Sequence, residues 1–168
     1  MLTHALRLVA LASLTAPVCF AQPNPQYGIK DPSPPLGSNI RRNITEGSHV
    51  PINKTYSELS PEEREAVHRY YEKIETGDEP PFPAEGLQPI HSAVAKAQQK
   101  LLVTGQLVLI ASVGPNGNVT EVKAIGRPSP EMVQAAGSIV ALSKFKPALC
   151  KGQPCNMDFP FVFDFKVR

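Results

Sequence analysis

Two cysteines near the end of the chain have the residue type and spacing that could carry redox chemistry. Cys150 and Cys155 enclose the four residues Lys-Gly-Gln-Pro. This spacing is wider than the Cys-x-x-Cys of thiol oxidoreductases, and no helix start follows the pair to activate a thiolate. We therefore expect a structural disulfide across a turn, which stabilises the fold by about 2 kcal/mol in the chain-entropy model.

The histidines do not have the spacing of a metal site. His49, His68 and His91 remain once an N-terminal signal is removed, and none has another His or Cys three or four residues away. Glu65 and Glu72 flank His68, so we expect ion pairs on a solvated helix face. The chain also has no nucleophile elbow, P-loop or dinucleotide fingerprint. We expect no catalytic residue, metal, cofactor or small-molecule substrate.

The last segment has the clearest strand pattern, because apolar residues alternate with others: Phe159, Phe161, Phe163, Phe165 and Val167. Proline cannot donate to a strand ladder, so Pro160 predicts that 157–167 is an edge strand. If Pro160 faces away from the sheet, the main-chain groups of Val162, Asp164 and Lys166 point outward. A partner peptide could then add there as a further strand. The alternative is that Pro160, Asp164 and Lys166 discourage such pairing.

Three helices are expected to support this strand. The first spans about 61–75, because Ser60-Pro61-Glu62-Glu63 forms a capping box and an apolar stripe follows. A second helix is expected at roughly 89–101. A third begins at Pro130 and ends near Lys144, with a broad apolar stripe.

Two further strands are expected between the second and third helices. The segment 106–113 is apolar on both faces, which is typical of a central strand that is covered on both sides. Asn116-Gly117 favours a tight hairpin turn, and 118–125 returns as the next strand. The pattern predicts an α+β domain over 57–168.

The N-terminal third does not have the pattern of a packed fold. Residues 1–21 resemble a secretory signal that is cleaved after Ala21, and residues 22–56 read as a proline-rich flexible linker. Removing the signal takes away Arg7 and leaves the charge near neutral, so we expect neither nucleic acid nor an anionic membrane as a partner. It also leaves Cys150 and Cys155 as an even pair for an oxidising compartment.

The order and punctuation of these elements resemble the C-terminal domain of the TonB energy-transducer family over about Gly105–Val167. The matching motifs are Gly105-Gln-Leu-Val, the hairpin Val113-Gly-Pro-Asn-Gly-Asn-Val119, Phe145-Lys-Pro-Ala148 and Gly152-Gln-Pro154. The resemblance implies a three-stranded antiparallel sheet packed by one long helix, with the first two helices as additions. It also implies binding of a protein or peptide, such as an outer-membrane receptor.

The family's transducers keep an uncleaved membrane helix and a long proline-rich spacer, whereas this chain has a signal that looks cleaved and a short linker. These departures leave three functions open. The first is a periplasmic binding module that recruits a partner through Pro160, Val162, Asp164 and Lys166. The second is an envelope structural or inhibitory, immunity-like protein that uses another face, such as helix 61–75. The third is a membrane-anchored energy transducer, which requires that the signal is not cleaved.

Overall fold

A computed structural model describes residues 39–40, 50–126 and 128–166 of the 168-residue chain. The predicted signal, residues 1–21, and most of the predicted linker lie outside these described residues. Within them, no helix is long and apolar enough to cross a membrane.

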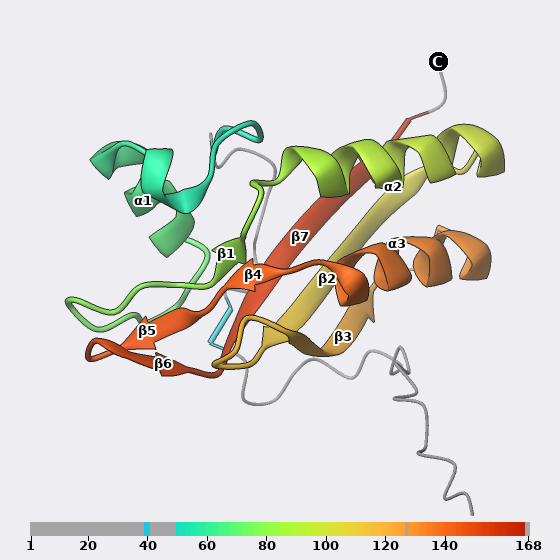
Figure 1. Cartoon of the computed structure of the whole chain (residues 1–168). Coiled ribbons are helices and arrows are strands. Elements are labelled where there is room, and N and C mark those ends of the chain that lie inside the picture. The colour runs from blue at the N-terminus through green and yellow to red at the C-terminus, as the bar shows by residue number, and fades with distance from the viewer. Residues whose placement is uncertain (1–38, 41–49, 127, 167–168) are drawn as a thin grey trace, which may run out of the picture.

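A three-stranded antiparallel sheet forms the centre of the domain (Figure 1). Strand β2 (Gly105–Val113) lies in the middle, between β3 (Val119–Ile125) and β7 (Met157–Phe165). The turn between β2 and β3 has Gly117 at φ +75°, which the Asn-Gly pair permits at low cost. The apolar character of β2 on both faces therefore predicted its central position correctly.

Two helices cover one face of this sheet, α2 (Gln88–Leu101) and α3 (Pro130–Leu142) (Figure 1). A shorter helix, α1 (Pro61–His68), follows a 3₁₀ turn, η1 (Tyr56–Glu58), beside one end of the sheet. Two small ribbons complete the fold. They pair β1 (Phe82–Pro83) with β4 (Phe145–Lys146) and β5 (Ala148–Cys150) with β6 (Gln153–Cys155). The predicted α+β class is confirmed.

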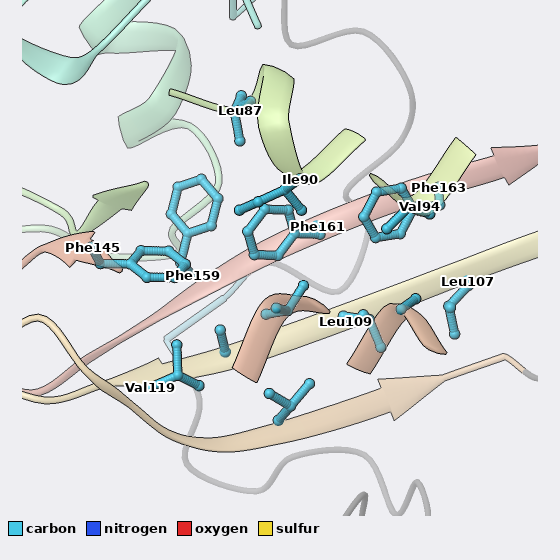
Figure 2. Packing of buried hydrophobic residues seen from close by; sticks show 14 of the residues in the cluster. Leu87, Ile90, Val94, Leu107, Leu109, Val119, Phe145, Phe159, Phe161 and Phe163 are labelled. Carbon is cyan, nitrogen blue, oxygen red and sulfur yellow. The ribbon is translucent and has the colours of Figure 1, made fainter. Parts of the chain in front are cut away.

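The alternating phenylalanines of β7 build the core under the helices. Phe159, Phe161, Phe163 and Phe165 are all buried on the helix-covered face. Successive rings lie 5.1 to 6.1 Å apart, and Ile90 and Val94 of α2 pack over them (Figure 2). Aromatic pairs at this separation contribute beyond the area that they bury, so β7 is fixed firmly along its inner face.

The first helix is shorter than predicted: it ends at His68, whereas the sequence predicted an end near residue 75. Val67 packs in the main core, whereas Tyr71 packs with Ile40 and Ile110 in a second cluster. Because side chains alternate along β2, Ile110 lies on the sheet face opposite the helices. The chain must therefore leave the helix so that Tyr71 can reach the other face.

Part of the segment that was expected to be a linker packs into the domain. Val50 and Tyr56 are both buried in the main core, and Ile40 forms an isolated β-bridge with Tyr71. Lys54 also forms a 2.7 Å ion pair with Glu63 at the start of α1. These contacts tie residues 50–56 to the same core as the predicted domain 57–168.

Candidate partner-binding edge of the sheet

Strand β7 lies at the margin of the sheet, as Pro160 predicted. Among the described residues, β7 pairs along its length with β2 alone. The register places Pro160 opposite Ile110 and Asp164 opposite Gln106. Whether a partner strand could pair with β7 therefore depends on which residues direct their main-chain N–H and C=O groups away from β2.

Three observations indicate that Asp158, Pro160, Val162 and Asp164 direct their main-chain groups away from β2. Pro160 has no N–H, so it fits only where a ladder bond to β2 is not needed. The carbonyl oxygen of Asp158 accepts a 2.8 Å hydrogen bond from the hydroxyl of Tyr71. The carbonyl of Gln106, opposite Asp164, points toward Gly126 beyond β3, so it does not face β7. Because main-chain directions alternate along a strand, all four residues share this direction.

Side chains close the two ends of this open edge. Tyr71 covers the start of β7 through its bond to Asp158. At the other end, the amide of Gln98 on α2 donates to the carbonyls of Val103 and Lys166, at 3.2 and 3.3 Å. In the stretch between them, from Pro160 to Asp164, Pro160 lacks an N–H, whereas Val162 has both an N–H and a C=O on the outer side.

A groove of about 360 Å³ lies between this edge and α2. Its walls are the α2 side chains His91, Val94, Ala95 and Gln98 and the β7 residues 162–166. Between the polar side chains of His91 and Gln98, the helix wall consists of the buried Val94 and the small, exposed Ala95. Such a groove next to an open strand edge has the shape for an extended peptide.

The charges of the groove are few and paired. Lys166 forms a 2.6 Å ion pair with Asp164 at its open end. His91 lies against Phe163, with ring centroids 5.2 Å apart. Burial lowers the pKa of His91, so its imidazole is held in the neutral form. The helix wall therefore adds no charge to the groove near neutral pH.

The structure places three of the four predicted residues in the groove and one outside it. Val162, Asp164 and Lys166 line the groove, whereas Pro160 is buried just before it. Sequence reasoning missed the α2 wall and the covering Tyr71. The signal for the wall was the apolar spacing of Ile90, Val94, Ala97 and Leu101 on the second helix, which predicts a buried helix face and not a groove.

Cys150 and Cys155 are bonded to each other across the β5–β6 hairpin. Lys151 between them donates its main-chain N–H to the carboxylate of Asp78 at 2.8 Å. Glu79 and Leu149 exchange two main-chain bonds of 2.8 and 2.9 Å. The disulfide thus closes a hairpin that is fixed to the segment before β1.

The two histidines of the described part of the chain belong to different parts of the domain. His68 places Nε2 3.5 Å from the hydroxyl of Tyr56, and His91 belongs to the groove. Within the described ranges, no group of three or more His, Cys, Asp or Glu side chains could hold a metal ion. His49 lies outside the described residues.

Comparison with known proteins gives one family. No curated protein matches the chain. The family model described as Gram-negative bacterial TonB protein C-terminal matches residues 95–167, from the second half of α2 to the end of β7. The match covers the sheet, α3 and most of the groove, and it indicates a TonB-like protein-interaction module. The resemblance seen in the sequence is therefore confirmed, and residues 95–167 have the sequence pattern and the fold of a TonB C-terminal domain.

Proposed function

We propose that the protein is a periplasmic TonB-like binding module that recruits an extended segment of a partner, such as an outer-membrane receptor, along β7. The observation that carries the proposal is the outward direction of the Val162 main-chain groups beside the groove between β7 and α2. A partner strand would pair with the N–H and C=O of Val162 and extend the sheet by β-augmentation. Binding, and not catalysis, is the function that such a site supports.

The groove favours a short partner segment with small or apolar residues at alternate positions. Tyr71 and Gln98 limit the open edge to Pro160–Asp164, so few main-chain bonds are possible. Side chains of an added strand alternate between the two sheet faces. Those on the inner face would meet Val94 and Ala95 of α2 and the neutral ring of His91.

The alternative use of the edge residues is protection against pairing. Protective charges on an edge strand act when they point at an incoming strand without a partner. Here Asp164 and Lys166 pair with each other at 2.6 Å. Pro160 stands before the groove and does not cover the main-chain groups of Val162. This arrangement supports recruitment along the edge.

The test uses a substitution that removes one outward N–H and little else. Val162→Pro should leave the fold intact, because the N–H that it removes does not bond to β2. Seven-residue peptides are first selected from a display library against the chain and are then titrated by NMR. V162P should abolish binding, and V162T, which keeps the N–H, should retain it. Equal binding by both variants would contradict the proposal.

The same titration separates the other two functions. Shifts confined to α1, with none in β7, would favour an envelope structural or inhibitory protein that uses another face. The energy-transducer function depends on the N-terminus. N-terminal sequencing of the protein from the periplasm of a Gram-negative host tests this, and we expect the mature protein to begin at Gln22. Retention of residues 1–21 would instead favour a membrane-anchored transducer.

A further inference from the structure

Two consecutive leucines at the end of α2, which we call the leucine tip, are exposed to solvent. Leu101 is 38% exposed and Leu102 is 68% exposed. They lie at the end of the helix pair where α2 ends and α3 begins (Figure 1). Apolar residues scattered singly over a protein surface are ordinary, so exposure alone does not mark the tip as a binding site.

The backbone of Leu102 supplies a second observation. Leu102 has φ 51° and ψ 39°, in the left-handed region that favours glycine and asparagine. Its N–H donates a 2.8 Å hydrogen bond to the carbonyl of Gln98 at the end of the helix. Leucine at this position strains the backbone and gains little from burial, because most of its side chain faces solvent. A residue that destabilises the fold at an exposed position points to a use outside the fold.

The solvent face of α2 that leads to the tip is basic. Lys96 and Lys100 are one helical turn apart, and both are exposed. Neither lysine forms an ion pair within the part of the chain that the structure describes, and this includes Glu131 in the first turn of α3. No acidic residue occurs in α2. The near-neutral total charge predicts no anionic membrane as a partner, but a total does not reveal that two lysines lie beside exposed leucines.

We propose that the leucine tip inserts into the surface of a phospholipid bilayer, with Lys96 and Lys100 against anionic head groups. Apolar side chains flanked by lysines bind at this boundary, because the apolar part leaves water while each ammonium group stays at the level of the phosphates. The contact is small, so the binding is weak and reversible. It does not rest on the function proposed for β7, since neither leucine takes part in pairing with a partner strand.

The tip lies beside one end of the groove between β7 and α2. Gln98 connects the two, because its main-chain carbonyl accepts the bond from Leu102 and its side-chain amide donates to the carbonyl of Lys166. A chain that rests on a bilayer through the tip would therefore hold the Lys166 end of the groove close to the lipid surface. A segment that emerges from a membrane protein would reach the groove there.

Co-sedimentation of the mature chain, beginning at Gln22, with lipid vesicles tests the proposal. Residues 1–21 are left out because an apolar signal would insert by itself. We expect binding to vesicles of phosphatidylcholine mixed with phosphatidylglycerol, and roughly tenfold weaker binding to phosphatidylcholine alone, because both lysines then lose their attraction to anionic head groups. The double variant K96Q/K100Q should abolish this difference between the two kinds of vesicle.

The variant L102N separates insertion from folding. Asparagine tolerates the left-handed backbone, so L102N should unfold at a urea concentration at least as high as the unchanged chain requires. It should nevertheless bind the mixed vesicles roughly tenfold more weakly, because it cannot insert an apolar side chain. Leu142 is the matched control, since it is 76% exposed at the far end of α3, and L142N should leave vesicle binding unchanged.

Two results of these measurements would overturn the proposal. The first is binding that L102N leaves unchanged, or that is equal for the two kinds of vesicle. The second is no binding to either kind of vesicle, which would favour an apolar surface of another protein as the partner of the tip.

Discussion

The hydroxyl of Tyr71 donates a 2.8 Å hydrogen bond to the main-chain carbonyl of Asp158, 87 residues later in the chain. Tyr71 is buried on the sheet face opposite α2 and α3, in contact with Ile40 and Ile110. Burial, together with the nearby Asp158, raises the pKa of Tyr71 well above its usual value, so the hydroxyl remains a donor. This bond determines where the covered part of the β7 edge ends and where the open part begins.

Replacing Tyr71 by Phe should lower the free energy of unfolding by about 1 kcal/mol, because the partly buried carbonyl of Asp158 loses this donor. Tyr56→Phe is the control, since the hydroxyl of Tyr56 makes only a 3.5 Å contact with His68. The chain has no tryptophan, so urea unfolding is followed by circular dichroism. Equal stability of Y71F and the unchanged protein would mean that Tyr71 does not secure the start of β7.

Gly117 and Gly152 provide a matched pair for the hairpin between β2 and β3. Both have positive φ, +75° and +79°, so alanine is strained at both positions. At Gly117 an added Cβ would also overlap the carbonyl oxygen of Phe145, whereas at Gly152 nothing lies within 4 Å. We expect G152A to cost about 1 kcal/mol and G117A clearly more, measured by urea unfolding. Similar losses would show that β4 does not pack tightly on this turn.

The disulfide between Cys150 and Cys155 should stabilise the domain by about 2 kcal/mol, because it closes a short loop in the unfolded chain. The double variant C150S/C155S should therefore unfold at lower urea concentration than the oxidised protein. A reductant should lower the stability of the unchanged chain to that of the double variant and should leave the variant unaffected. A reductant effect on C150S/C155S would point to another cause.

Stability should also depend on pH through His91. Its pKa in the folded protein is lowered by burial, while the unfolded chain has the ordinary value of about 6.5. Between these two values the unfolded state binds more protons, so the free energy of unfolding falls as the pH falls below about 6.5. Above that pH this contribution is constant. Thermal unfolding at a series of pH values should show a flatter profile for H91Q over the same window.

The sequence predicted those parts of the site that depend on local chemistry. The missing N–H of Pro160 restricts it to an edge, and the alternating phenylalanines require one buried face, so both features of β7 are visible in the residues. The disulfide follows from two cysteines close in sequence.

The rest depends on contacts between distant segments. Nothing near Tyr71 in the chain indicates Asp158, and nothing near Gln98 indicates the carbonyl of Lys166. The early end of α1 has the same origin, because Tyr71 leaves the helix pattern to pack against Ile40 and Ile110. A stripe of apolar residues shows that a helix face is buried, but it does not show which surface buries each residue.

The central claim is that the main-chain groups of β7 alternate between β2 and an open outer edge. Amide hydrogen exchange of the free protein, followed by NMR, measures this directly. We predict slow exchange for Phe161, Phe163 and Phe165, whose N–H groups bond to β2, and exchange faster by orders of magnitude for Val162. Equal protection of all four amides would contradict the account, because it would mean that the outer edge of β7 is already paired at Val162.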